Sequence, residues 1–380
     1  MLILVAVTVT VALRGGLFDT AKRAAQKTKE EAEAERNMYE AEYYMARANG
    51  ETDAETFTDY MLEEYYGGVE IGDYVAYEEG TYTYTPDTSK GVATEYPSGE
   101  WVSGVFKYNN LSSSELETQD FGWRVLGVSD TGALELISDD VTSEKIYLVG
   151  KESWLYGPDE LNRMCDNLYG KGTYSSGARS INVDDINKIT GYNPEKTGDG
   201  QPFGYGTVAQ YGNEVTFTLN GEGKVQYTSS VANGTYNATS FTHPDGRTLG
   251  ENNVESITLK ADYYYYYPAS RQTGPQEYSP AYLDSNSNEY KLLFTNRDGA
   301  GIPIYYLASS YVQIDSWCWF GIMDCGTDSI GGGGLYSMAG MSDKKDRYVR
   351  PVVTLKSGIT ITKDATHDGS TLAKACTISE

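Results

Sequence analysis

The residue types that most often perform catalysis are either scarce in this sequence or stand without suitable partners. Its only histidines, His243 and His367, lie in predicted loops and belong to no nucleophile motif. The sequence also lacks a phosphate-binding loop, the dinucleotide glycine motif, HExxH, GxSxG and the Cys-x-x-Cys-His haem attachment. We therefore predict a protein that is not an enzyme and that carries no cofactor.

The abundant carboxylates leave two kinds of chemistry to consider. A glycosidase needs two acids facing one sugar, and no such pair can be chosen from 54 aspartates and glutamates. A secreted glycan-active enzyme therefore stays open as a remote alternative. Asp284, Asn286 and Asn288 imitate the start of a calcium loop, but Glu289 replaces its glycine and Thr295 its closing glutamate. We predict no metal site.

The four cysteines suit an exported protein with disulfides. They allow three pairings, and no Cys-x-x-Cys indicates a zinc or redox site. We predict that Cys318 pairs with Cys325 across a short loop, and that Cys165 pairs with Cys376 and holds the C-terminal tail. Four buried thiols are the alternative.

The chain begins with an uncharged apolar strip, MLILVAVTVTVAL, although its formal net charge is −24. Burial of the large side chains of this strip is worth on the order of 15 kcal/mol. The strip is shorter than the roughly 20 residues that a membrane-spanning helix needs, and it lacks the features of a secretory signal. It either packs against copies of itself or is the end of a longer apolar helix. Its large members are Met1, Leu2, Ile3, Leu4, Val5, Val7, Val9, Val11 and Leu13.

A long amphipathic helix is predicted next, over residues 17–66. Ala, Glu, Lys, Arg and Met dominate its first half, and no proline interrupts it. One stripe of small and aromatic residues recurs at helical spacing. This stripe contains Leu17, Ala21, Ala24, Thr28, Ala32, Tyr39, Tyr43 and Ala46. Asn49 and Gly50 could instead end the helix, with a second one near residues 53–66.

The first forty residues resemble the N-terminal region of type IV pilins and pseudopilins of Gram-positive, clostridial-type bacteria. The resemblance rests on a glycine break followed by an Ala/Lys-rich helix. The matching residues are Gly16, Leu17, Phe18, Ala21, Lys22, Ala24, Ala25, Lys27, Thr28 and Glu31. The family implies a helix that first sits in the cytoplasmic membrane and then enters the core of a helical filament of identical subunits.

The resemblance assigns the filament core to the apolar strip together with Leu17, Ala21 and Ala24. Gly15 and Gly16 would mark a helix break, since glycine costs a helix interior about 1 kcal/mol relative to alanine. One feature departs from the family. Pilins usually carry glutamate at the fifth mature position, where this chain has Val5. We interpret Met1 as lying downstream of the mature N-terminus; assembly without that ion pair is the alternative.

The rest of the chain is predicted to be β-rich, because 34 tyrosines and many threonines alternate with polar residues between glycine-rich turns. The fold class is therefore α+β, with residues 1–66 as the polymerisation helix and residues 67–357 as a globular surface domain. A loop-rich insertion is expected near residues 198–290, and residues 358–380 form a C-terminal tail. Short helices are expected near residues 158–168 and 183–189. The predicted strands include residues 73–77, 122–128, 133–138, 145–149, 214–219, 291–294, 304–308 and 349–355.

Blocks of this domain resemble secreted domains with a C-type-lectin-like or formylglycine-generating-enzyme-like core. They include Trp123-Arg124-Val125-Leu126, Ala178-Arg179-Ser180-Ile181-Asn182 and Val349-Arg350-Pro351-Val352-Val353. We expect their apolar residues in the core, and we expect Arg124, Arg179 and Arg350 to bind carbonyls or carboxylates.

The acidic charge argues against nucleic-acid binding, which needs clustered lysine and arginine. We expect a structural subunit of an extracellular type IV pilus-like filament on the cell surface. It would be membrane-embedded before assembly and would display an acidic domain for adhesion or motility, with a glycan or another surface as its target. The alternative is a membrane-anchored adhesin or carbohydrate-binding protein that does not polymerise.

Overall fold

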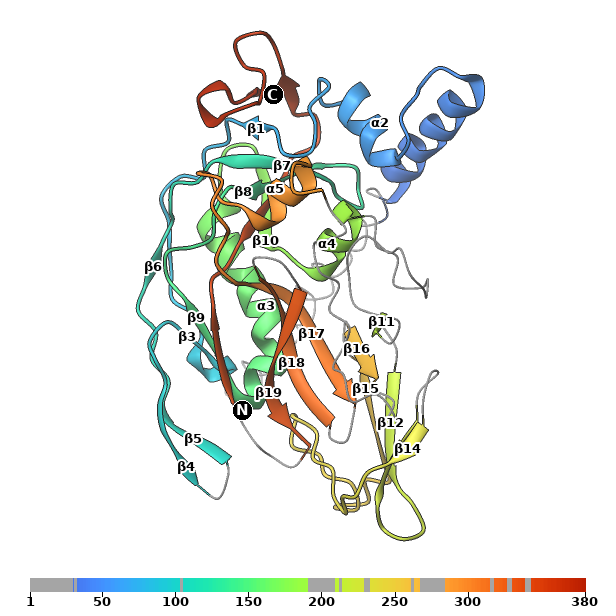
Figure 1. Ribbon diagram of the computed structural model, residues 1–380, viewed down its shortest axis with the longest axis vertical. Helices are drawn as coiled ribbons and strands as arrows, with labels where there is room; N and C mark the ends of the chain where they lie inside the picture. The colour runs from blue at the N-terminus through green and yellow to red at the C-terminus, as the bar shows by residue number, and fades with distance from the viewer. Residues whose placement is uncertain are drawn as a thin grey trace, which may run out of the picture.

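The computed structural model is mostly β (Figure 1). It describes residues 30, 33–102, 105–190, 209–211, 214–228, 233–260, 263–266, 284–314, 318–326, 330–338 and 343–380. None of the helices within these residues is both long and apolar enough to cross a membrane.

The predicted long N-terminal helix is wrong over the part that the structure describes. Helix α1 spans residues 33–49 and stops at Gly50, which adopts a φ of 68° that favours glycine. The chain then starts a new helix, α2 (Phe57–Glu64), because Thr56 and Asp59 form a reciprocal capping box. A second helix after Asn49 was the alternative expectation. The predicted filament-core residues and the break at Gly15 and Gly16 lie outside the described residues.

Helices α1 and α2 form a hairpin held together by tyrosines. The Tyr43 ring is 3% exposed and lies 5.5 Å from the ring of Tyr60, and Tyr39 meets Tyr65 at 4.8 Å. The Tyr66 hydroxyl donates to the carbonyl of Gly132 at 2.7 Å. The predicted stripe of Tyr39, Tyr43 and Ala46 therefore faces the chain's own domain.

The central sheet has five antiparallel strands in the order β1-β7-β8-β21-β10. Their bounds are Tyr74–Val75, Trp123–Val128, Leu134–Ser138, Pro351–Leu355 and Ser175–Ser180. Every residue of β8 is buried, so this strand is covered on both faces. Helix α3 (Gly150–Tyr169) packs against β10, which confirms the predicted helix near residues 158–168.

The second sheet is ordered β11-β16-β17-β18-β19, and β16 pairs with β17 in parallel. Its strands span Ala209–Tyr211, Tyr263–Tyr266, Tyr305–Ile314, Cys318–Cys325 and Ile330–Ser337. Helices α4 (Val183–Thr190) and α5 (Asn288–Phe294) contribute to a core that includes residues of both sheets. Residues 291–294 are thus helical, and the predicted strand there is wrong.

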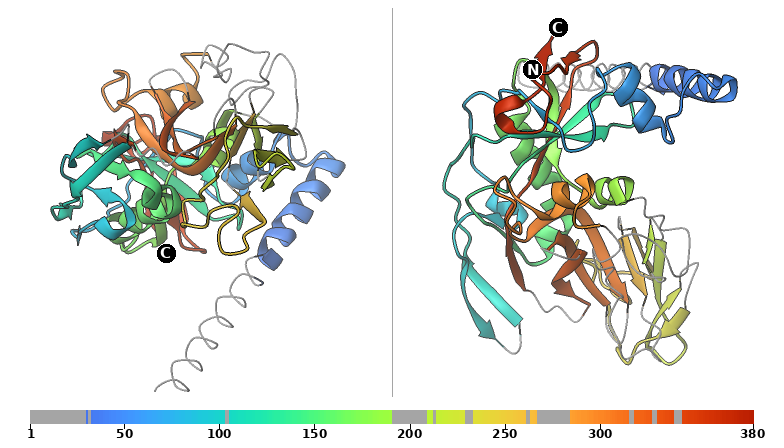
Figure 2. Two further views of the ribbon diagram at one scale, coloured as in Figure 1. Left: turned by 90° about the horizontal axis from the view of Figure 1, so that it is seen from below. Right: turned by 45° about the horizontal axis from the view of Figure 1, so that its top comes forward.

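A third sheet, ordered β14-β13-β12-β15, occupies the region predicted as a loop-rich insertion. Its strands span Asn233–Thr235, Val225–Thr228, Glu214–Leu219 and Ser256–Lys260. It shares a core with helix α3 and the second sheet, through Trp154 and Phe320, and in this core the rings of Phe217 and Phe241 stack at 4.1 Å. This sheet lies at one end of the molecule, and α2 lies at the other with the C-terminus (Figures 1 and 2).

Short strands complete the fold. They are β2 (Thr83–Tyr84) with β6 (Leu116–Glu117), β3 (Val92–Ala93) with β9 (Ile146–Val149) and β20 (Lys344–Arg347), β4 (Ser98–Val102) with β5 (Val105–Asn110), and β22 (Thr360–Thr362) with β23 (Thr377–Ser379). The 3-10 turns η1 (Thr88–Lys90) and η3 (Leu372–Lys374) lie between strands. The tail of residues 358–380 is therefore folded onto the domain beside β1.

The predicted disulfides are not formed: the four cysteines are buried and no disulfide joins them. Cys318 and Cys325 are the two ends of the single extended strand β18. An extended strand rises about 3.3 Å per residue, so their Cα atoms are far beyond the roughly 7 Å limit for a disulfide. Cys165 lies on α3, whereas Cys376 lies beside β1.

Candidate functional site

The histidines and the calcium-like segment do not form a site. His243 packs beside Trp154 and binds Asp245 at 2.7 Å, whereas His367 lies in the C-terminal hairpin beside Asp364. Asp284 uses its Oδ1 to accept hydrogen bonds from Asn286, which closes its own turn. No group of metal-ligating side chains occurs within the described residues.

The outer face of α1 is an exposed apolar surface. Met38 is 50% exposed and Met45 is 60% exposed, and alanines continue the line along the helix. Successive members are four and three residues apart, which is the spacing of a coiled-coil seam. We call this set the α1 outer stripe; it consists of Ala34, Met38, Ala41, Met45 and Ala48. Since Tyr39, Tyr43 and Ala46 take the inner face, the domain leaves the α1 outer stripe uncovered.

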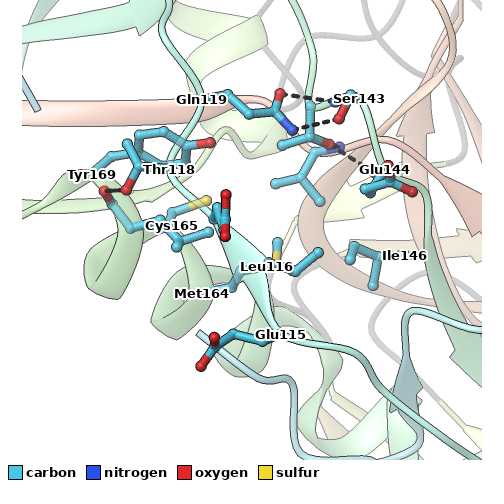
Figure 3. A pocket seen from close by; sticks show the side chains of 14 residues that line it. Glu115, Leu116, Thr118, Gln119, Ser143, Glu144, Ile146, Met164, Cys165 and Tyr169 are labelled. Atoms are coloured by element: carbon cyan, nitrogen blue, oxygen red, sulfur yellow. Dashed lines mark hydrogen bonds between the residues drawn. The ribbon is translucent and has the colours of Figure 1, made fainter. Parts of the chain in front are cut away.

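A cavity of about 340 Å³ opens between β6, the loop at residues 141–145 and the C-terminal half of α3 (Figure 3). We call it the α3 pocket. It is lined by Glu115, Leu116, Glu117, Thr118, Gln119, Thr142, Ser143, Glu144, Ile146, Met164, Cys165, Leu168, Tyr169 and Val349.

The walls of the α3 pocket are fixed by hydrogen bonds. The Gln119 amide pairs with Ser143 twice, donating to its hydroxyl at 2.7 Å and accepting from its backbone at 2.9 Å. Thr118 donates to the carbonyl of Leu168 at 2.9 Å, which joins the wall to α3. The side chains of Thr118, Gln119 and Ser143 therefore hydrogen-bond to the walls of the pocket.

The floor of the α3 pocket is apolar and contains two sulfur atoms. Met164 is 2% exposed, Cys165 is fully buried, and Ile146 and Val349 complete the surface. Burial raises the pKa of the Cys165 thiol, so the sulfur stays protonated and neutral. The thiol is therefore a packing group and not an activated nucleophile.

Tyr169 is the exception among these residues. It is 1% exposed, yet its hydroxyl makes no hydrogen bond of ordinary length and angle within the described part of the chain. Its ring packs against the rings of Phe121 and Trp123, with distances between ring centres of 5.6 Å and 5.9 Å. Burial raises its pKa, and a weak hydrogen bond from the main chain of Gln119 offsets this rise only in part. This hydroxyl is therefore neutral, fixed in place and closed off from the cavity.

The rim of the α3 pocket is acidic. Glu115, Glu117 and Glu144 are exposed, and no lysine or arginine is among the described lining residues. The neighbouring Lys145 is already paired with Asp346 at 2.8 Å. The rim therefore favours a positively charged group.

No protein-family model, curated protein or solved structure matches this chain.

A second cleft of about 430 Å³, between α2, α4 and β7, contains an ion-pair cluster. Arg179 bridges Asp185 at 2.6 Å and Glu135 at 2.9 Å. Burial raises the pKa of Glu135, and Arg179 opposes that shift. Both carboxylates are engaged, so this cluster holds β8, β10 and α4 together, as expected for Arg179.

Sequence reasoning did not predict the α3 pocket. One signal was present: Met164 and Leu168 are four residues apart, as are Cys165 and Tyr169, so both pairs lie along one side of α3. Nothing in the sequence shows that the residues after β6 stay far enough from that side to leave a cavity.

Proposed function

We propose that this chain is a subunit of an extracellular filament of identical copies, and that it displays its β-rich domain on the filament surface. The observation that carries the proposal is the α1 outer stripe. A monomer leaves it in water, whereas a second copy of α1 would cover it.

The apolar strip of residues 1–13 supports the same proposal from the sequence. It precedes α1 in the chain, so copies gathered by the strip would bring their α1 helices close together. Methionine suits such a contact because its flexible side chain fits irregular surfaces. Alanines at alternate positions let two helices approach closely.

The distribution of the elements agrees with surface display. The α1–α2 hairpin lies at one end of the molecule, and the third sheet lies at the other (Figure 1). If copies assemble through α1, the third sheet faces outward, and the net charge of −24 keeps neighbouring domains soluble. Adhesion or motility would be the role of such a surface.

Electron microscopy of material sheared from producing cells tests the proposal. We expect filaments from the wild type and none from Val7→Asp, because the substitution would bury an unpaired charge among apolar strips. The double variant Met38→Glu/Met45→Glu should also lose filaments. The control Tyr156→Glu, at a 45% exposed tyrosine of α3, should keep them.

Protein that is only monomeric or membrane-bound in the wild type would contradict the proposal and favour an anchored adhesin. Filaments of normal length from the Met38/Met45 variant would exclude the α1 outer stripe from assembly. Circular dichroism of each variant checks that the β-rich domain remains folded.

A further inference from the structure

We propose that two copies of this chain associate through one edge of the third sheet. Strand β14 of one copy pairs with β14 of the other, so that the two sheets form one continuous sheet. The role of this contact as a link between neighbouring filaments rests on the proposed function, whereas the contact itself does not.

The segment that contains β14 is uncharged although it is exposed. Residues 225–242 contain no Asp, Glu, Lys or Arg, whereas 22% of the whole chain is charged. Asn233, Thr235 and Asn237 are exposed, and Tyr236 between them is buried. Burial in the core of the domain therefore does not explain why this segment lacks charge.

The two edges of the third sheet differ in how they are protected. Within the described residues β14 pairs with β13 alone, and β15 pairs with β12 alone. Two exposed acids, Glu251 and Glu255, precede β15, and the strand ends at Lys260. Charged residues of this kind keep an edge strand from pairing with another chain. The uncharged β14 has no such protection, so its edge is the one that can accept a further strand.

The net charge determines where two copies can meet. Each copy carries a formal net charge of −24, so acidic surfaces of two copies repel each other. The residues of β13 that lie beside β14 are also neutral, with Gln226 opposite Thr235 and Thr228 opposite Asn233. Two identical edges of this kind can therefore approach to the strand spacing of about 4.8 Å without placing like charges opposite each other.

The position of β14 suits a contact between filaments. The third sheet lies at the end of the molecule opposite α2 (Figures 1 and 2), so assembly through α1 leaves β14 accessible. The strand has only three residues, and a single pair of strands is therefore a weak contact. Copies repeated along two filaments supply many such contacts at once, and multivalency makes the total association strong. We expect the filaments to lie side by side in bundles.

Cysteine cross-linking of the full chain in concentrated solution tests the contact directly. The four natural cysteines are buried, so a short bismaleimide reacts with an introduced surface thiol. In the joined sheet the two copies of Thr235 lie on adjacent strands, whereas the two copies of Thr258 lie on the outermost strands, about 34 Å apart. Thr235→Cys should therefore give about 10-fold more cross-linked dimer than its matched control Thr258→Cys.

Salt and charge separate this contact from one made by ion pairs. Raising the NaCl concentration from about 20 mM to about 300 mM screens the repulsion between copies, so the yield of Thr235→Cys dimer should rise, whereas an ion-paired contact would weaken. Asn237→Lys in the Thr235→Cys background brings like charges together across the joined edges. We expect it to lower the yield about 5-fold.

Electron microscopy of sheared filaments tests the lateral role. Thr235→Lys should leave filament length unchanged and abolish the bundles, because a lysine at the edge opposes pairing. The control Thr258→Lys, on the opposite edge of the same sheet, should keep them. Both threonines are exposed, so circular dichroism should show the same fold in both variants.

Three results would overturn the proposal. They are equal dimer yields from Thr235→Cys and Thr258→Cys, bundles that persist in Thr235→Lys, and a glycan that occupies the edge. Mass spectrometry of protein from producing cells detects the last, because Asn233 and Asn237 each begin an Asn-x-Thr sequon. A lack of filaments in the wild type would contradict the proposed function alone, since the cross-linking is measured on the chain in solution.

Discussion

Two buried polar side chains, Arg350 and Tyr169, differ in how well their polar groups are hydrogen-bonded. Arg350 is fully buried and donates to the carbonyl of Ser138 from Nη2 at 3.0 Å and to that of Leu293 from Nη1 at 3.2 Å. Its guanidinium also lies 5.5 Å from the Tyr305 ring. Tyr169 is nearly as buried, but its hydroxyl makes no hydrogen bond of ordinary length and angle within the described residues and has only a weak one from the main chain of Gln119.

The difference separates a polar group that joins elements of the fold from a polar group that the fold only encloses. The Arg350 cluster connects β21, β8 and α5 through main-chain carbonyls, so removing its donors damages the fold. The Tyr169 hydroxyl has only a weak hydrogen bond from the main chain of Gln119, so its removal should change stability little. The free energy of unfolding of variants at Arg350 and at Tyr169 tests this difference.

The largest effect should come from Arg350→Met. This change keeps the apolar stem but removes the Arg350 donors from the Ser138 carbonyl and from the Leu293 carbonyl, which keeps the Tyr305 hydroxyl as a donor. A buried carbonyl that loses its donors costs about 1–3 kcal/mol. We expect the free energy of unfolding to fall by about 3 kcal/mol, measured by chemical denaturation. Arg247→Met, at a 50% exposed side chain paired with Asp245, should cost less than about 1 kcal/mol. Equal losses in the two variants would refute the structural role of Arg350.

A smaller, pH-dependent effect is expected at Glu79, which lies behind the ring cluster of Tyr169. Glu79 accepts hydrogen bonds from Trp123 Nε1 at 3.1 Å and from the backbone of Phe121 at 3.3 Å. Burial raises its pKa above the ordinary value of 4.5. The folded protein therefore holds this proton to higher pH than the unfolded chain, and stability decreases as pH rises from about 4.5 through the raised pKa.

Glu79→Gln cannot titrate. Its single amide oxygen can accept from only one of the two donors, so the variant also loses one hydrogen bond, by an amount that does not depend on pH. Its stability relative to the wild type should therefore increase between pH 4 and pH 7, by less than the loss in Arg350→Met. Denaturation curves at several pH values measure this difference. A constant difference across that range would show that Glu79 ionises equally well in the folded and unfolded chain.

The smallest effect should come from Tyr169→Phe. The ring keeps its contacts with Phe121 and Trp123, and only a weak hydrogen bond from the main chain of Gln119 is lost. We expect the free energy of unfolding to change by less than about 0.5 kcal/mol, with stabilisation as the favoured direction. A loss above about 1.5 kcal/mol would show that the hydroxyl bonds within the fold, and the comparison with Arg350 would fail.

The sequence predicted local features better than long-range ones. The strands around Trp123 and Val352, the helix before Tyr169 and the carbonyl-bound Arg350 all follow from patterns within a few residues. The strand predicted at residues 291–294 was wrong because an apolar run this short does not distinguish a strand from a buried helix. Ser287 caps the N-terminus of α5, and this cap favours a helix over a strand.

The prediction of one long N-terminal helix was wrong for a related reason. Helix-forming composition extends across Asn49 and Gly50, but the tyrosines on both sides of that turn gain more by packing against each other than one continuous helix would allow. The prediction of a disulfide between Cys318 and Cys325 was wrong because the segment between them was interpreted as a loop, whereas it is the strand β18. The α3 pocket depends on the distance between β6 and α3, which no local pattern records.

The C-terminal segment determines how the domain resists tension applied through α1. Strand β1 pairs with β7 on one side. On the other side, the backbone N–H of Cys376 donates to the carbonyl of Tyr74 at 2.8 Å, and the backbone N–H of Ala76 donates to the carbonyl of Cys376 at 2.9 Å. Tyr74 also donates to the carbonyl of Gly369 at 2.8 Å. Once the contacts of the hairpin and of Gly72 with the domain are broken, a force that pulls on the hairpin reaches β1, where hydrogen bonds lie on both edges of the strand. The last residues of the chain therefore act as a mechanical clamp at the point where the load enters the domain.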